Sequence, residues 1–156
     1  MKIKTCCFSG DNKLPSNRIK QIVKRLDLEI DCLISQGVTD FITVGTLGFD
    51  QLAASFIIIK KEMGQDIRLI FALPCKNQDA FWNVEQKGLY RNLIAEADEV
   101  IYVSEEYNDW CIKKCNRYIV DRSLFCICAQ LNTFSGTNQT VRYARQKGLR
   151  VINVAE

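Results

Sequence analysis

Short apolar segments alternate with longer amphipathic segments along the whole chain. The apolar segments are Ile3–Phe8, Phe41–Val44, Ile67–Leu73, Val100–Val103, Leu124–Leu131 and Val151–Val154. Several are apolar at every position, which is typical of parallel strands buried on both faces. The alternation therefore predicts an α/β fold: a doubly wound, mostly parallel sheet of about six strands, with helices on both faces in three layers.

The segments between the strands carry helical patterns. Apolar residues from Ile19 to Ile34 recur at helical spacing, with Ser16 or Asn17 as N-cap and Gly37 as the stop. Four further helices are predicted at Asp50–Met63, Asn77–Ala97, Asp109–Asp121 and Gln139–Lys147. The run Phe56–Ile59 also fits a strand by periodicity, but the basic residues that follow it favour a helix. No linker interrupts the pattern, so we expect one domain over residues 1–156.

Composition excludes several classes of function. The chain has no histidine, which rules out a Ser-His-Asp triad and the commonest zinc ligand. A net charge of +3 is too mild to indicate a nucleic-acid or membrane partner, so we expect direct nucleic-acid binding to be absent. The N-terminus is too short and polar for a signal peptide, and no apolar run is long enough to span a bilayer. We therefore expect a cytoplasmic protein.

Eight cysteines in a protein without an export signal indicate reduced thiols. Cys111 and Cys115 lie four residues apart and share a helix face. Together with Cys75, Cys126 and Cys128 they match no common zinc spacing, and buried free cysteine often acts as a small apolar residue. We expect no metal site.

Two strand-to-helix turns resemble each other, Thr43–Asp50 and Thr133–Thr137. Glycine in such turns lets backbone approach a ligand, and free N–H groups at a helix start attract anions. In parallel sheets, ligands bind outside the carboxyl ends of the strands. No Walker A sequence is present, and the first strand does not lead into G-x-G-x-x-G, which argues against a P-loop NTPase and an ordinary dinucleotide dehydrogenase.

For several other candidate residues, an ordinary structural role is the alternative to ligand binding. Asp50 either interacts with the helix dipole or accepts hydrogen bonds from a ribose hydroxyl or water. The basic helix with Lys113, Lys114, Arg117 and Arg122 is usually a solvated face, although Asn116 or Arg117 at the ligand edge would suit a phosphate. Among the aromatic residues, Tyr107 directly follows a strand and is the best placed to touch a ligand.

The chain resembles the YpsA-like proteins of the SLOG superfamily, which are similar to the "lonely guy" enzymes and to DNA-processing protein A. The motifs that carry the resemblance are Ser9-Gly10, Gly45–Ala54, Ala97–Val100, Asn116–Ser123 and Gly136–Ala144. The resemblance implies a Rossmann-like fold and a role in sensing or processing nucleotide-derived ligands. Transferred by position, the pocket would be lined by Ser9, Gly10, Gly45, Gly48, Asp50, Asn116, Asp121, Gly136 and Thr137. Tyr107 and Arg117 complete the predicted ligand-binding set.

The sequence departs from the family pattern at several of these positions. Relatives usually carry Gly-His-Arg-Pro in the first loop, where this chain has Gly10–Lys13. Cys115 occupies the position before Asn116, where relatives commonly have an Arg. Val44 and Ser135 each replace the first glycine of a glycine pair in the two turns. These changes predict weaker binding of a polyanion, with Lys13, Arg18 and Arg117 as compensating cations.

Three functions follow from the resemblance. The first is binding or sensing of a nucleotide-like small molecule, with no other cofactor and with a homodimer compatible with the fold. The second is a phosphoribohydrolase that releases a base from a nucleoside monophosphate. Thr140 stands where those enzymes carry a catalytic Glu, so Asp50 and Asp121 are the remaining weak catalytic candidates and an enzyme is the less favoured prediction. The third is an accessory protein in DNA processing.

Overall fold

A computed structural model describes residues 3–131 and 136–156, with the backbone alone at residues 136–138. Six strands form one sheet: β1 (Lys4–Gly10), β2 (Val38–Thr43), β3 (Arg68–Leu73), β4 (Glu99–Tyr102), β5 (Phe125–Ala129) and β6 (Arg150–Asn153). Their order is β4-β3-β2-β1-β5-β6, and each neighbouring pair is parallel. The predicted parallel, Rossmann-like α/β sheet is confirmed.

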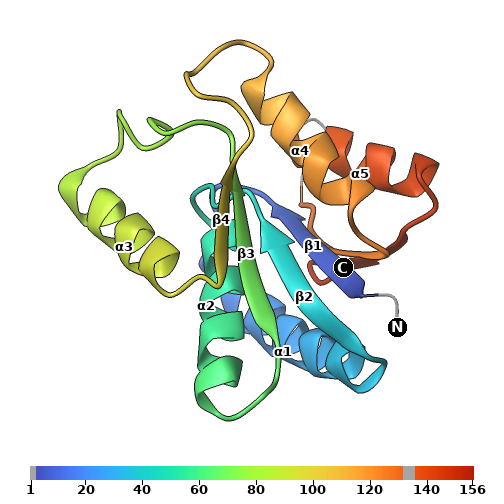
Figure 1. Ribbon diagram of the computed structural model, residues 1–156. Coiled ribbons are helices and arrows are strands. Elements are labelled where there is room, and N and C mark those ends of the chain that lie inside the picture. The colour runs from blue at the N-terminus through green and yellow to red at the C-terminus, as the bar shows by residue number, and fades with distance from the viewer. Residues whose placement is uncertain (1–2, 132–135) are drawn as a thin grey trace.

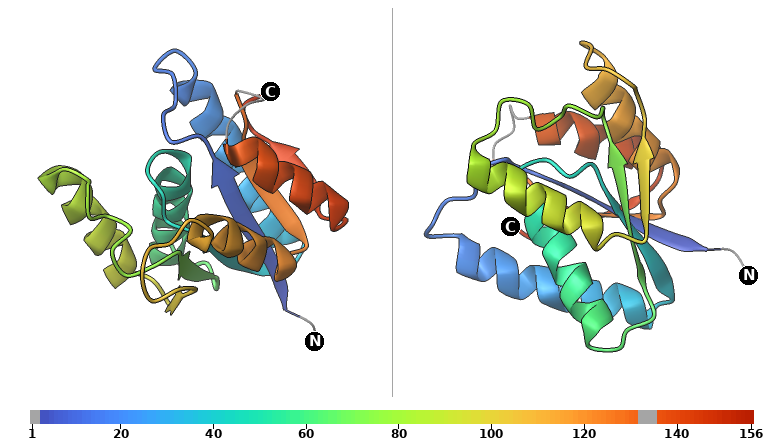
Figure 2. Two further views of the ribbon diagram at one scale, coloured as in Figure 1. Left: turned by 90° about the horizontal axis from the view of Figure 1, so that it is seen from above. Right: turned by 60° about the vertical axis from the view of Figure 1, so that its left-hand side comes forward.

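Five helices connect the strands: α1 (Ile19–Ser35), α2 (Phe49–Glu62), α3 (Val84–Ala95), α4 (Cys111–Asp121) and α5 (Gly136–Gln146). The chain runs outward from β1 to β4, then returns through α4 to β5 on the other side of β1. Because such crossovers are right-handed, this reversal places α1, α2 and α3 on one face and α4 and α5 on the other. Figures 1 and 2 show these two helical layers on either side of the sheet.

Each face of the sheet has its own apolar core. On the first face, Phe8, Phe41 and Phe71 of the strands pack with the apolar sides of α1 and α2. On the second face, Cys7, Cys126 and other small strand residues pack against α4 and α5. Strand side chains alternate between these cores, which explains why the strands are apolar at nearly every position.

Several helix boundaries differ from the prediction. Helix α3 begins at Val84, not Asn77, because Asn83 caps it through a reciprocal capping box with Gln86. Helix α1 follows Arg18, so neither Ser16 nor Asn17 is its N-cap. The predicted stop at Gly37 is confirmed by its φ of 94°, and Phe56–Ile59 is helical as expected.

The strand order reverses at β1, which lies between β2 and β5. The loops after β1 and β2 and the start of α5 therefore meet at one point on the carboxyl edge of the sheet, where ligands of doubly wound proteins bind. In the described part of the chain, none of the helices has the length and apolar character that crossing a membrane requires.

Candidate functional site

A pocket of about 220 Å³ lies at this reversal point. It is lined by Ser9, Gly10, Asp11, Asn12, Val44, Thr46, Asp50, Ile112, Asn116 and Thr140. These residues come from the ends of β1 and β2 with their loops, the first turn of α2, and the facing sides of α4 and α5. We call this cavity the switch-point pocket.

The first two loops are held against each other at the floor of the pocket. The Phe49 amide donates a hydrogen bond to the carbonyl oxygen of Asp11 at 3.2 Å. A Cβ at Gly48 would lie 2.3 Å from the carbonyl oxygen of Asn12, and one at Gly10 would lie 2.3 Å from the Cβ of Phe49. Close contact between the two loops therefore requires glycine at both positions, whether or not a ligand binds.

Asp50 is a buried carboxylate in the wall of the pocket, with 3% of its surface exposed. Its Oδ2 accepts a hydrogen bond from Thr46 Oγ1 at 2.8 Å, whereas its buried Oδ1 makes none with the described residues. Burial raises the pKa of Asp50 from 3.8 to about 7, although Thr46 and weaker contacts with the Gly10 and Thr46 amides oppose the shift. Asp50 is therefore only partly ionised near neutral pH.

Asp11 places a second carboxylate in the same pocket. Its Oδ2 accepts a hydrogen bond from the Leu131 amide at 3.2 Å. Its Oδ1 is buried and has no hydrogen-bond partner among the described residues. Buried polar oxygens are normally satisfied, so an unpaired oxygen on each of two carboxylates indicates that the pocket accepts hydrogen bonds from a ligand or from water.

A larger groove of about 560 Å³ adjoins the switch-point pocket. It runs between α4 and α5, and the two cavities share Ile112, Asn116 and Thr140 in their walls. The remaining lining residues are Asp109, Trp110, Lys113, Arg117, Gln139, Arg142, Tyr143 and Gln146. We call it the α4–α5 groove.

Tyr143 joins the two helices beside this groove. Its hydroxyl donates a hydrogen bond to Asp121 Oδ1 at 2.7 Å, and the guanidinium of Arg117 lies 5.0 Å from the centre of its ring. Lys113 lies 5.7 Å from the ring centre of Trp110, which is 69% exposed. The wall of the groove therefore combines cations with aromatic faces.

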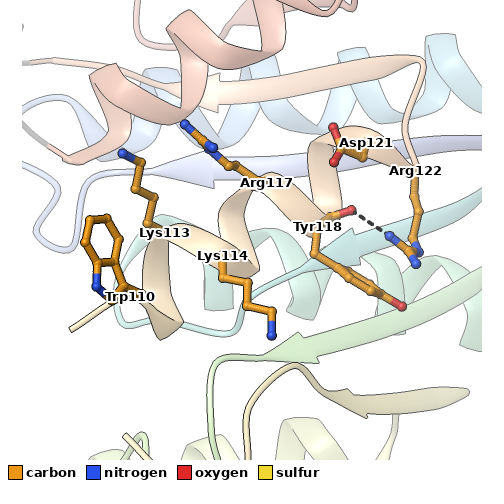
Figure 3. Close-up of a pocket in the computed structure, with 7 residues that line it drawn as sticks. All are labelled: Trp110, Lys113, Lys114, Arg117, Tyr118, Asp121 and Arg122. Carbon is orange, nitrogen blue, oxygen red and sulfur yellow. Dashed lines mark hydrogen bonds between the residues drawn. The ribbon is translucent and has the colours of Figure 1, made fainter. Parts of the chain in front are cut away.

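Figure 3 shows a third hollow, of about 480 Å³, along the outside of α4. Its lining side chains belong to α4 and the residues that flank it, so it is a depression on the surface of one helix. Lys113 and Arg117 project from one side of α4, and Lys114 and Tyr118 project from the other (Figure 3). Only the first pair also lines the α4–α5 groove.

The structure brings together four of the predicted ligand-binding residues: Ser9, Gly10, Asp50 and Asn116 line the switch-point pocket. Arg117 lines the neighbouring groove, whereas Asp121 lines only the α4 surface. Tyr107 is 60% exposed and lines none of these cavities.

The two predicted glycine turns are only partly described. Gly45 and Gly48 belong to the first turn, where their φ angles are 75° and 85°. They do not line the switch-point pocket. Most of the second turn, including Ser135, lies outside the described residues, and Gly136 and Thr137 begin α5. Six lining residues were left out of the candidate set by sequence reasoning: Asp11, Asn12, Val44, Thr46, Ile112 and Thr140. Two of these, Asp11 and Val44, directly follow strands.

The departures from the family pattern have distinct structural settings. Cys115 is buried and donates a hydrogen bond to the carbonyl oxygen of Ala72 at 2.8 Å, so this side chain packs under the site and does not line it. Burial also raises the pKa of its thiol. Arg18 donates to the carbonyl oxygen of Ala155, and neither Arg18 nor Lys13 lines a cavity described above.

The eight cysteines are all free thiols, and seven of them are buried. Within residues 3–131 and 136–156, no group of three Cys, Asp or Glu side chains is arranged to hold a metal ion. Cys126 and Cys128 belong to the second apolar core instead.

Comparison with known families gives one extended match. The model of the YpsA family, in full the YspA SLOG family, matches residues 6–148. The uncharacterized SPbeta prophage-derived protein YoqJ of Bacillus subtilis is 33% identical over 118 residues, which cover 68% of this chain and 69% of YoqJ. A UPF0398 protein of Brevibacillus brevis is 24% identical over 65% of this chain, but the match spans only 55% of its own length.

Solved structures support the fold. DNA processing protein A (DprA) from Streptococcus pneumoniae superposes with a TM-score of 0.70 and 16% identity, covering 96% of this chain and 49% of that one. DprA from Helicobacter pylori, whose structure concerns its single-stranded DNA binding, gives a TM-score of 0.67 at 14% identity and covers 95% of this chain and 63% of that one. At such identities the likeness concerns the fold alone, and this chain spans about half to two thirds of each DprA chain.

Proposed function

Because this chain belongs to the YpsA family of SLOG proteins, we propose that it binds a nucleotide-derived small molecule in the switch-point pocket. The observation that carries the proposal is the pair of carboxylates, Asp11 and Asp50, each with a buried oxygen that lacks a partner among the described residues. A ligand that donates hydrogen bonds, such as a ribose with its hydroxyl groups, would satisfy both.

The dimensions of the site agree with this class of ligand. Small-molecule sites usually measure about 300–1,000 Å³, so the switch-point pocket alone, at about 220 Å³, suits only part of a nucleotide. Joined with the α4–α5 groove through Asn116 and Thr140, the site reaches the usual range. Asn116 offers both a donor and an acceptor at the junction, which suits the edge of a base or a sugar.

A thermal-shift screen tests the proposal with nucleosides, nucleotides, NAD, ADP-ribose and cyclic dinucleotides. We expect at least one of them to raise the melting temperature of the wild-type protein, since a ligand that binds only the folded state stabilises it. An Asn116→Ala variant should lose that rise, and Asn92→Ala, at an exposed position of α3 away from the pocket, is the matched control. The absence of any shift across the panel, with folded protein, would contradict the proposal.

A second candidate function, hydrolysis of an N-glycosidic bond, is favoured by Asp50 alone. A carboxyl group whose pKa is about 7 is suited to proton transfer at neutral pH. Thr140, at the position of the lonely-guy glutamate, lines the same pocket and carries no carboxylate itself. Release of free adenine from AMP by purified protein, lost in Asp50→Asn, would establish this reaction. Absence of adenine release by a protein that binds AMP would leave binding as the function.

A further inference from the structure

We propose that the α4–α5 groove is a phosphate subsite, so that the ligand places its uncharged sugar or base in the switch-point pocket and its phosphate chain along α4 and α5. This inference rests on the proposed function for the uncharged part of the ligand. It reverses the orientation that glycine turns ordinarily suggest, in which the phosphate lies at the turn.

The charges within the switch-point pocket argue against a phosphate there. Asp11 and Asp50 line it, whereas none of the described lysine or arginine side chains does. A phosphate beside two carboxylates would meet repulsion from each ionised group, and in a partly buried site that repulsion is only weakly screened.

The α4–α5 groove has the opposite character. Lys113, Arg117 and Arg142 line it, and Asp109 is the one carboxylate among the described residues of its lining. None of the three cations forms an ion pair with a carboxylate in the described part of the chain. Arginine suits phosphate because its planar guanidinium donates two parallel hydrogen bonds.

The contacts of Arg117 hold it on the wall of the groove. Its guanidinium lies against the ring of Tyr143, whose hydroxyl is tied to Asp121. A cation that is already positioned by a ring loses less conformational freedom when it binds an anion. Asn116 lines both cavities and Arg117 lines the groove, so a ligand that extends from Asn116 into the groove meets Arg117 in the same wall.

The substrate class that fits is a nucleoside carrying two or more phosphates, or a molecule of the same layout such as a sugar joined to a diphosphate. A free nucleoside would occupy only the pocket, and inorganic polyphosphate would occupy only the groove. The two parts of the site can therefore be tested separately.

The experiment uses Trp110 as a reporter, because it lines the groove and is largely exposed. A Trp82→Phe background removes the only other tryptophan of the chain, which packs on Tyr90 in the other core. In this background, adenosine, ADP and inorganic tripolyphosphate are titrated by fluorescence, and each affinity is confirmed by calorimetry. The test variant is Arg117→Gln/Arg142→Gln. The control is Lys20→Gln/Lys24→Gln, which removes the same charge from exposed positions on α1, across the sheet.

We expect ADP to bind about tenfold or more tightly than adenosine, since charge-assisted hydrogen bonds to phosphate are stronger than neutral ones. The arginine variant should lose this advantage and its affinity for tripolyphosphate, and keep its affinity for adenosine. The lysine control should keep all three properties. Equal affinities for adenosine and ADP, no response to tripolyphosphate, or equal losses in both variants would overturn the proposal.

Two further outcomes separate the inference from the function on which it rests. Arginine-dependent binding of tripolyphosphate without any binding of adenosine or ADP would support the groove as an anion site and contradict the proposed nucleotide pocket. An oligothymidylate of about 12 nucleotides that bound more tightly than ADP through the same arginines would overturn the proposal, because it would assign the groove to a nucleic-acid strand.

Discussion

Asp50 affects both the stability of the fold and the proposed function. Its carboxyl group is nearly inaccessible to solvent, has one unpaired oxygen among the described residues, and has a pKa near 7. Keeping an ionised carboxylate in this position costs folding free energy at alkaline pH. Replacing Asp50 should therefore stabilise the fold at alkaline pH while removing a carboxylate from the proposed binding pocket. The gain in the free energy of unfolding can be measured.

The first prediction concerns the pH dependence of stability at Asp50. Its pKa is raised from 3.8 to about 7 on folding. Its contribution is therefore fully present below about pH 4 and is lost as the pH rises through 7, a loss of up to about 4 kcal/mol. Asp50→Asn, which keeps an acceptor for Thr46, should raise the free energy of unfolding by about 2–4 kcal/mol at pH 8 and change it little at pH 4.

Urea unfolding at the two pH values measures this difference. The matched control is Asp66→Asn, at an exposed position that forms no ion pair within the described residues. An Asp50→Asn variant with the same gain at pH 4 as at pH 8 would show that the ionised carboxylate is not the destabilising feature.

The second prediction concerns the contact between the first two loops. Gly48 and Gly148 have similar φ angles of 85° and 81°, but an added Cβ would clash with the Asn12 carbonyl only at Gly48. Gly148→Ala should therefore cost about 1 kcal/mol from backbone strain alone. Gly48→Ala should cost about 2–4 kcal/mol, since its φ of 85° and ψ of −125° suit only glycine and overpacking is added to that strain. Equal losses in thermal unfolding would contradict the close loop contact.

At the scale of elements, α3 gives a third prediction. Its capping box joins Asn83 and Gln86 reciprocally at 2.8 and 3.1 Å, so Asn83→Ala should destabilise the protein by about 1 kcal/mol. Gly88 lies within the same helix with no atom near an added Cβ, so Gly88→Ala should stabilise it by about 0.5–1 kcal/mol. Effects of the same sign in chemical unfolding would contradict a helix that begins at Val84.

Elements were more predictable than their ends. Apolar periodicity correctly indicated the six strands and five helices, because burial on both faces leaves a strong pattern. The start of α3 was predicted seven residues too early, since residues 77–82 contain nothing that forbids a helix. Its true boundary depends on the hydrogen bonds of Asn83, which sequence spacing alone does not distinguish from those of other polar residues.

At the scale of the whole molecule, the strand reversal at β1 explains why Ser9, Gly10, Asp50 and Asn116 meet although they lie far apart in the chain. The rule that ligands bind at the ends of parallel strands was enough to select them. It was not enough to place Tyr107, Asp121 or Cys115, because the direction of a side chain depends on helix rotation and packing. The α4–α5 groove was likewise missed, since it arises only when two helices pack together.

The central claim is that the switch-point pocket binds a nucleotide-derived ligand. It is tested most directly by ¹H–¹⁵N NMR titration of the labelled wild-type protein with the nucleotide panel. We predict saturable shifts of the backbone amides of Gly10, Thr46, Asn116 and Thr140, with the amides of α3 unchanged. Spectra without shifts across the panel, or shifts confined to elements that do not line the pocket, would contradict the account.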